Sequence, residues 1–373
     1  MASERVNIMP GNIEWAIHRA GYQAAEYYEK NPDVMKWISG EKNPTFHQLE
    51  TFANKVKVPF GYLFIEQLPV ERLPFTMFRG GSAEPDYFDL DVYDTVINIQ
   101  RRQEWLEDYL VENDIETFNA KKSISGMTVD DAVSQIRDLV GLAPDWAFAF
   151  NSQDAAVNHF TECLEERGIF VAFNGVVGNN THRQLSVDKC RGFAMVSSTA
   201  PYIFINSSDS KNAQLFTLLH ELAHILSGSS AGHRGFDFSV NNSEEVFCDK
   251  VAAEFLVPAS LLTPMWNSDI RKLSRDFKVS EIVIARRAHD LGLMSDIEYR
   301  SFASSFYKRP RISKKGSGGD FYRSCAKRVG RTFAVHVYNA VRTRQLSYTD
   351  AYLLTNVRYC TLNEALREMG VKI

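Results

Sequence analysis

The sequence FTLLHELAHIL, residues 216–226, is apolar except for a threonine, two histidines and a glutamate. His220 and His224 are four residues apart, so on a helix both imidazoles project from the same face. Two imidazoles in this arrangement can bind one zinc ion at nitrogen–zinc distances of about 2.0–2.1 Å. Because unpaired polar groups are costly to bury, a metal accounts for histidines on an apolar helix. We therefore predict one Zn²⁺ per chain, held on a helix from Asn212 to about Leu226.

Glu221 lies directly after the first of these histidines. Successive residues point about 100° apart around a helix, so its carboxylate would lie beside the metal and not on it. That is the position of a general base that takes a proton from zinc-bound water. A purely structural zinc site needs no such base and closes its fourth position. Glu221 is therefore the predicted catalytic residue.

A catalytic zinc site also needs a third protein ligand and one open position. Histidine-last metzincins have a glycine and a histidine where this chain has Ser227 and Ser230, which excludes that class. A zincin can instead take a carboxylate from a later helix. The stretch from Ser243 to Leu256 predicts such a helix, because Ser243 can cap it and Pro258 ends it.

Glu245 is the predicted third metal ligand on this second helix. Asp249 lies one turn further along the same face and is predicted to accept a hydrogen bond from a ligand histidine. Glu244 and Glu254 remain alternatives for the third ligand. His233, in the glycine-rich stretch after the motif, is either a hydrogen-bond donor to a transition-state oxyanion or a surface histidine.

The rest of this region predicts an α+β fold. Short apolar segments bounded by turn residues predict a small sheet ahead of the histidine helix, and a small sheet followed by helices is typical of an α+β fold. The predicted strands are 169–173, 193–196 and 202–205, the predicted helices before the motif are 129–140 and 154–167, and 175–181 is predicted to be a loop. Two further helical stretches, 321–344 and 349–369, close the chain.

Length, composition and charge limit the remaining possibilities. The 373 residues are enough for two to four domains, and 45% hydrophobic with 24% charged residues is typical of a globular protein. A net charge of −4 provides no overall attraction to nucleic acid or to an anionic membrane. The five cysteines form no C-x-x-C pair, which argues against a disulfide framework. Without a signal-peptide core or an apolar run of about 18 residues, the chain is predicted to be cytoplasmic, with no membrane partner.

Residues 10–66 predict a run of five short helices, typical of a helix-turn-helix bundle. The candidate recognition helix spans 31–38 and offers Asn31 and Lys36 to DNA. Six basic and six acidic residues balance across 10–65, so few phosphate contacts are available. Binding a partner protein, or packing on the rest of the chain, is therefore favoured over DNA binding.

These motifs together resemble the ImmA/IrrE family of metallopeptidases, over most of residues 155–300. The resemblance implies that the third zinc ligand is Glu245, and Cys248 and Val251 are mild departures from the family pattern. It also implies a narrow-specificity protease that cleaves or controls helix-turn-helix repressors in mobile elements and stress responses. The segments that carry it are 166–171, 191–193, 204–206, 216–224 and 245–258.

Some larger members of that family fuse a repressor-like domain to the peptidase, and some of these are similar to toxins of toxin–antitoxin pairs. Residues 10–66 resemble the Xre-type helix-turn-helix, and the tail after Gly319 is similar to the one that such fusions carry. The predicted domains are an Xre-like helix-turn-helix domain at 1–66, an acidic helical connector at 67–126, a zinc peptidase domain at 127–305, and a basic linker with a C-terminal helical unit at 306–373.

The predicted function is therefore a zinc endopeptidase of narrow specificity, whose protein substrate is a small helix-turn-helix repressor or antitoxin. The alternative is a regulator or toxin that acts by binding DNA or an antitoxin, with a latent or structural zinc site. The intact Glu221 favours the peptidase. An oligomer is compatible with either function.

Overall fold

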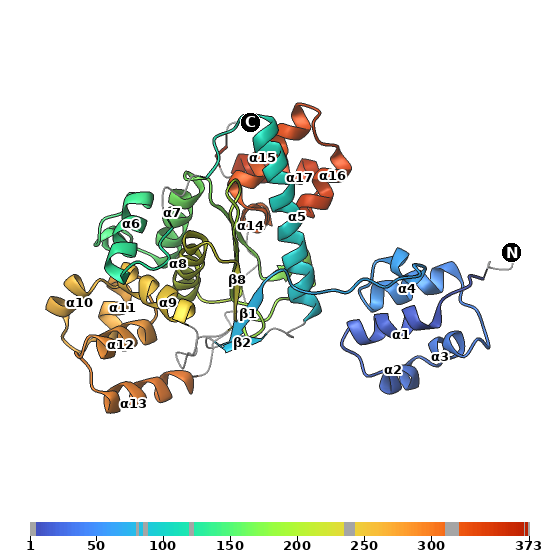
Figure 1. Ribbon diagram of the computed structural model, residues 1–373, viewed down its shortest axis with the longest axis horizontal. Helices are drawn as coiled ribbons and strands as arrows, with labels where there is room; N and C mark the ends of the chain where they lie inside the picture. The colour runs from blue at the N-terminus through green and yellow to red at the C-terminus, as the bar shows by residue number, and fades with distance from the viewer. Residues whose placement is uncertain are drawn as a thin grey trace. The chain divides into compact units, whose positions relative to one another are not determined.

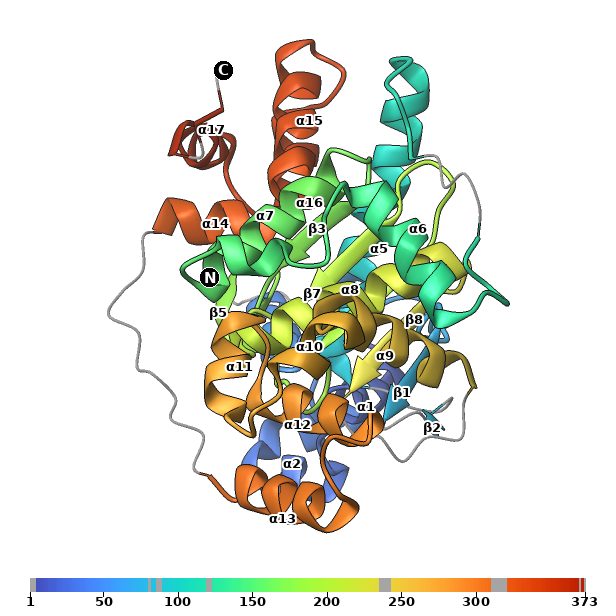
Figure 2. The same cartoon turned by 90° about the vertical axis from the view of Figure 1, so that its left-hand side faces the viewer.

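The computed structural model describes residues 5–79, 82–84, 89–118, 123–234, 243–309, 321–368 and 370–371 (Figures 1 and 2). Contacts between residues divide the chain into two compact units. The first comprises residues 1–73 and 88–93, and the second comprises 74–87 and 94–373. Helices predominate in both units and the second also holds a small mixed sheet, so the predicted α+β class is confirmed.

The first unit is a set of short helices with a core of its own. Thr45 and Gln48 form a reciprocal capping box at the start of its last α-helix. The aromatic rings of Trp37 and Phe52 pack edge to face in the core beside Ile13. The fifth predicted helix is a single 3₁₀ turn. The elements are α1 (Pro10–Arg19), α2 (Ala24–Lys30), α3 (Pro32–Ile38), α4 (Phe46–Lys55) and η1 (Phe60–Leu63).

The second unit is built on a six-stranded sheet with the strand order β2-β1-β8-β6-β7-β3. The three predicted strands form its buried part, where β3 runs parallel to β7 and β6 runs antiparallel to it. The strands of this sheet are β1 (Thr76–Arg79), β2 (Ser82–Glu84), β3 (Phe170–Phe173), β6 (Gly192–Met195), β7 (Tyr202–Ile205) and β8 (Ala231–Arg234).

Several strands lie where the sequence predicts a loop or a helical connector. The predicted loop at 175–181 instead contains β4 (Val176–Val177) and the start of β5 (Asn180–Gln184), which pair with each other. Every residue of β5 is polar, so it has no alternation of apolar and polar residues to reveal it. The glycine-rich stretch contains β8, and the predicted acidic connector at 67–126 contains β1 and β2. Pairing between distant segments, and not local propensity, creates these strands.

Packing against β8 explains why β1 joins the sheet. The two strands run parallel with Met77 opposite Gly232. A Cβ atom on Gly232 would lie 2.3 Å from the sulfur of Met77 and 2.7 Å from a ring carbon of Phe75. The glycine thus admits both side chains, and Phe75 also packs against Phe193 of β6.

Helices cover both faces of this sheet (Figure 1). The helices α7 (Gln153–Glu165) and α8 (Lys211–Ser227) lie on one side, and α5 (Leu90–Glu112) and α14 (Phe321–Val329) lie on the other. One face of α5 is apolar and packs inward, since Val96, Ile99 and Leu106 are buried. The acidic side chains on the opposite surface of α5, among them Glu104 and Asp108, are exposed.

A buried arginine of α5 anchors the C-terminal helices. Arg102 donates hydrogen bonds to the carbonyl oxygens of Arg328, Val329 and Leu354. Its side chain is buried, so three acceptors compensate the cost of removing the guanidinium from water. The stretch that the sequence predicts as an acidic helical connector therefore includes a helix with one solvated face and one firmly packed face.

The C-terminal helical stretches are each divided into two helices. Gly330, with a φ of +90°, ends α14 before α15 (Arg331–Arg342) begins. Asn356, with a φ of +56°, separates α16 (Tyr348–Thr355) from α17 (Tyr359–Glu368). A left-handed residue cannot continue an α-helix, so the two predicted continuous helices were wrong in this respect.

The remaining helices follow the histidine helix in sequence. They are α9 (Ser243–Leu256), α10 (Ala259–Met265), α11 (Ile270–Asp276), α12 (Glu281–Asp290) and α13 (Asp296–Tyr307), and α6 (Val129–Val140) and the 3₁₀ turn η2 (Trp146–Ala149) precede α7. Both views place α10–α13 at the opposite end of this unit from α15 (Figures 1 and 2). The bounds of α6, α9 and β7 agree with the predicted ones to the residue. No helix in the described ranges is both long and apolar enough to cross a membrane.

Candidate metal centre

Two neighbouring helices bring three potential metal ligands together. His220 and His224 come from α8, and Glu245 comes from the first turn of α9. One ligand atom from each of these residues lies within 4.8 Å of the other two. The Nε2 atoms of the histidines are 3.2 Å apart, and the Glu245 carboxylate lies 3.4 Å from the first and 3.0 Å from the second. Three ligand atoms that point at one another form a site suited to one divalent ion.

The local sequence explains why these side chains face inward. Ser210 caps α8 by accepting a hydrogen bond from the backbone N–H of Ala213, and Gly228 ends the helix in the left-handed conformation. The apolar residues between these caps pack against β6 and β7 and against α9, which leaves the histidines on the α9 side. The exposed fraction is 1% for His220 and His224 and 2% for Glu245.

Asp249 fixes the ring of His220. The Oδ1 atom of Asp249 lies 2.9 Å from Nδ1 of the imidazole, one turn along α9 from Glu245. When Nδ1 carries the proton and donates to this carboxylate, the lone pair of Nε2 faces the cluster and is available for a metal.

The electrostatics of the cluster favour positive charge. Burial alone lowers the pKa of His220, but hydrogen bonds to Asp249 and Glu245 more than reverse this, and its pKa is well above the usual value. Burial also lowers the pKa of His224, and the neighbouring Cys248, Glu244 and Glu245 raise it well above the usual value. The same anionic surroundings attract a divalent cation.

Glu221 is buried beside this cluster, with an exposed fraction of 0%. Burial raises the pKa of its carboxyl group to about 7, against the opposing influence of His220 and His224. Within the described part of the chain, neither of its carboxylate oxygens accepts a hydrogen bond. A buried carboxylate without a donor is costly, and a water molecule held by a metal at the cluster would supply one. The residues present therefore fit a catalytic metal.

The two alternative third ligands have other partners. Glu254 forms an ion pair with Arg287 and accepts a hydrogen bond from the backbone N–H of Ala259. Glu244 has a side chain that is 42% exposed, and it accepts a hydrogen bond from the hydroxyl of Ser229. Among the described residues, Glu245 is the carboxylate that joins the two histidines in the cluster.

Ser229 belongs to the site although sequence reasoning missed it. Its Oγ atom lies 3.1 Å from Nδ1 of His224. The signal was present in the sequence, since a serine follows Gly228, the residue that ends the histidine helix. A left-handed glycine turns the chain back over the last helical turn, and the next side chain can then reach a histidine in that turn.

His233 remains a candidate donor to an oxyanion. Its backbone lies in β8, paired with Gly192 of β6, while its side chain is outside the part of the chain that the structure describes.

The residues predicted to contact DNA lie in the first unit. The side-chain amide of Asn31 donates to the carbonyl of Tyr27 and accepts from the ammonium group of Lys55, with both distances 2.7 Å. Lys36 is exposed on α3. Asn31 is thus engaged inside its own unit, and Lys36 is open to solvent.

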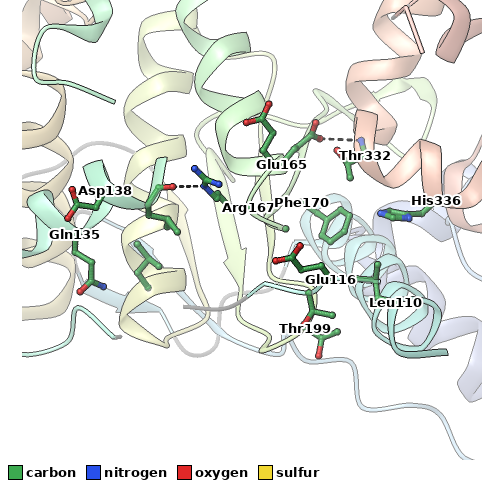
Figure 3. A pocket seen from close by; sticks show the side chains of 15 residues that line it. Leu110, Glu116, Gln135, Asp138, Glu165, Arg167, Phe170, Thr199, Thr332 and His336 are labelled. Atoms are coloured by element: carbon green, nitrogen blue, oxygen red, sulfur yellow. Dashed lines mark hydrogen bonds between the residues drawn. The ribbon is translucent and has the colours of Figure 1, made fainter. Parts of the chain in front are cut away.

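A cavity of about 990 Å³ lies in another part of the second unit (Figure 3). It is lined by residues of α5, α6, α7, β3 and α15, by Leu226 from the last turn of α8, and by residues of the segments that follow α5, α7 and β6. The Glu165 carboxylate accepts a hydrogen bond from the backbone N–H of Thr332 at 3.4 Å. Burial raises the pKa of Glu165 to about 7 and lowers that of His336 to about 4. The cluster of His220, His224 and Glu245 does not line this cavity, so it is not the metal site.

Comparison with known proteins agrees with the geometry over one part of the chain. Residues 164–289 match the family model of the IrrE N-terminal-like domain, Peptidase_M78. Residues 329–368, which cover α15–α17, match a domain of unknown function, DUF8813. No protein with a curated description and no solved structure matches the chain.

The matched segment 164–289 includes both histidines, Glu221, Glu245 and Asp249, and its family is of the peptidase type. Residues 164–289 of this chain therefore form a metallopeptidase-like domain similar to the IrrE N-terminal-like family.

Proposed function

We propose that this chain is a zinc-dependent endopeptidase of narrow specificity, with one zinc ion held by His220, His224 and Glu245. The observation that carries the proposal is Glu221, a buried carboxylate without a protein donor in the described residues, directly beside a His–His–Glu cluster. Three protein ligands leave a tetrahedral ion one open position, as catalytic zinc sites require.

The chemistry follows from what each side chain can do. When bound, zinc would lower the pKa of a coordinated water and polarise the scissile carbonyl. His220 and His224 direct their Nε2 atoms toward the cluster, and Asp249 holds the first of these rings. Glu221 takes the proton from water as the oxygen attacks the carbonyl carbon, and it then delivers that proton to the departing amine nitrogen. A carboxylate can act in this way as a general base and then as a general acid.

The proposed substrate is a protein, a small helix-turn-helix repressor or antitoxin in a mobile-element, stress-response or toxin–antitoxin setting. Similarity of residues 164–289 to a peptidase-type family supports a protein substrate. The helical first unit suits recognition of a protein partner, because it exposes large apolar side chains such as Tyr22, Met35 and Phe46. Exposed apolar residues of this kind contribute more to protein contacts than to phosphate contacts.

A Glu221→Gln variant tests the proposal most directly. The amide keeps the shape of the side chain but cannot take a proton, so cleavage of a co-expressed repressor should fall about 10²–10⁴-fold. Zinc content should stay at the wild-type level, because Glu221 is not a ligand. Glu166→Gln, an exposed position in the same domain, is the control.

The alternative function makes the opposite prediction for this variant. A regulator or toxin that acts by binding DNA or an antitoxin would keep its cellular phenotype after Glu221→Gln. An unchanged phenotype with zinc still bound would overturn the peptidase proposal.

A further inference from the structure

We propose that Ser229 and Glu244 form a hydrogen-bonded relay that holds the ring of His224 in its metal-binding orientation. They are positioning residues, since both act through His224. The inference rests on the proposed metal site and adds a part that neither the motif nor the family match assigns.

The end of α8 places Ser229 against the imidazole. The N–H of Gly228 donates to the carbonyl oxygens of His224 and Ile225, and the N–H of Ser229 also donates to the carbonyl of His224, at 3.1 Å. Gly228 has a φ of +84°, which is favourable for glycine and costly for other residues. This turn folds the chain back over the last helical turn. As a result, the hydroxyl of Ser229 lies 3.1 Å from Nδ1 of His224.

Glu244 completes the relay from the other helix. Its Oε1 atom accepts the hydrogen bond of the Ser229 hydroxyl and lies 3.8 Å from Nδ1 of His224. Glu244 directly precedes Glu245, so two successive residues of α9 contribute to the same site. Glu245 approaches the metal-facing nitrogen of His224, and Glu244 reaches the opposite nitrogen through Ser229.

The chemistry of the three groups allows hydrogen-bond donation along the relay in one direction only. A histidine that binds a metal through Nε2 carries its proton on Nδ1 and must donate it. A serine hydroxyl can accept that hydrogen bond and donate its own hydrogen onward. A carboxylate accepts only, so Glu244 ends the chain. With donation running from His224 to Ser229 and from Ser229 to Glu244, each donor in the relay has an acceptor.

The two ligand histidines are thus supported differently. His220 donates directly to Asp249, whose side chain is 16% exposed. His224 donates to the neutral hydroxyl of Ser229, which in turn donates to Glu244, whose side chain is 42% exposed. The direct and more buried carboxylate provides the stronger hydrogen bond. We therefore expect the hydrogen bond that orients His224 to be weaker than the one that orients His220. We also expect the orientation of His224 to be more sensitive to substitutions at the protein surface.

Ser229→Ala tests the relay, with metal affinity as the readout. The full-length chain is titrated with Zn²⁺ against a chromophoric chelator, and the environment of the metal is followed through the visible spectrum of the Co²⁺ form. Loss of an outer hydrogen-bond partner typically weakens metal binding by about 10–100-fold. We expect a loss in that range for Ser229→Ala, an altered Co²⁺ spectrum, and recovery of most of the affinity in Ser229→Thr, which retains the hydroxyl.

The neighbouring serine provides a matched control. Ser230 accepts a hydrogen bond from the backbone N–H of Val196 at 2.9 Å and takes no part in the relay. Ser230→Ala removes one hydroxyl from the same loop, so it should leave Zn²⁺ affinity within about twofold of wild type. Equal losses in Ser229→Ala and Ser230→Ala would mean that the loop matters only for folding, and the relay would be disproved.

Glu244→Gln separates the charge from the hydrogen bond. The amide oxygen can still accept from Ser229, so we expect a smaller loss of Zn²⁺ affinity than in Glu244→Ala. Failure of the relay and failure of the proposed function give distinct results. A wild-type chain that binds no zinc refutes the proposed function, whereas wild-type affinity retained in Ser229→Ala refutes the relay alone.

Discussion

The Nδ1 atom of His220 lies 2.9 Å from the Oδ1 atom of Asp249, although the two residues belong to different helices. This contact ties the middle of α8 to the second turn of α9 and orients one ligand nitrogen toward the cluster. Ligand helices that are fixed to each other in this way form a site before any ion binds, which lowers the entropic cost of binding.

Replacing Asp249 should weaken metal binding without removing a ligand. Asp249→Ala leaves Nδ1 of His220 without its acceptor, and we expect Zn²⁺ affinity to fall about 10–100-fold. Asp249→Asn can still accept a hydrogen bond and should fall less. Competition with a chromophoric chelator measures both variants, and unchanged affinity in Asp249→Ala would contradict the assignment of this residue.

Removing a metal ligand should weaken zinc binding more than removing the residue that orients that ligand. His220→Ala should abolish stoichiometric binding, so that elemental analysis finds about one zinc per wild-type chain and close to none in the variant. Zinc should also raise the melting temperature of the wild type, because a ligand present at 100 times its Kd stabilises the folded state by about 2.7 kcal/mol. His182→Ala, at an exposed strand position, should retain both properties. Zinc bound equally by His220→Ala would exclude the proposed ligand set.

Gly330 is one of the places where the C-terminal helices contact the sheet. Its φ is +90°, and a Cβ atom there would lie 2.7 Å from the carbonyl oxygen of Val171 in β3. Gly330→Ala combines backbone strain with this clash, and we expect the free energy of unfolding to fall by about 2–3 kcal/mol in urea titrations.

Gly141 separates these two contributions. It has a φ of +71° at the end of α6, and a Cβ atom there would meet no heavy atom within 4 Å beyond its chain neighbours, so Gly141→Ala carries the strain alone. We expect its cost to be about 1 kcal/mol. Equal costs at the two positions would show that the contact with Val171 contributes nothing.

The stability of the second unit should depend on the protonation of Glu165. Burial raises the pKa of this carboxyl group from 4.5 to about 7. The folded state therefore holds a proton that the unfolded state releases, and the resulting stabilisation is complete below about pH 4.5 and lost as the pH rises through 7. Because the side chain is half-buried, we expect this loss to be about 1 kcal/mol.

Glu165→Gln should remove that contribution to the pH dependence. Its stability relative to wild type should increase between pH 5 and pH 8, as measured by urea unfolding at fixed ionic strength. The exposed neighbour Glu166 offers the matched variant Glu166→Gln, which should keep the wild-type slope. A wild-type slope in Glu165→Gln would contradict the prediction.

The sequence predicted the centre of the site better than its surroundings, for physical reasons. The spacing of His220 and His224 follows from helical geometry, which is local and regular. The distance of Glu245 from the histidines depends on how α9 packs against α8. The helical period predicts only the face of α9 on which Glu245 lies. Ser229 was missed because its position depends on the turn at Gly228, which no periodic pattern describes.

The same distinction holds for the fold. The strands β3, β6 and β7 were predictable because a short, continuous apolar run is by itself the sequence pattern of a buried strand. The strands β1 and β8 have little such pattern, and they form through contact between Met77 and Gly232, residues far apart in the chain. The breaks at Gly330 and Asn356 depend on single backbone conformations within otherwise helical sequences.

The contact of Met77 with Gly232 also determines how this protein can be dissected. A shortened polypeptide beginning at residue 164 would include β8 but leave β1 behind, with the apolar side chains of Phe75 and Met77. The outer backbone groups of β8 would then be open to pairing with another molecule, a common route to aggregation. Isolation of the segment defined by family similarity therefore needs residues 74–79 supplied alongside it.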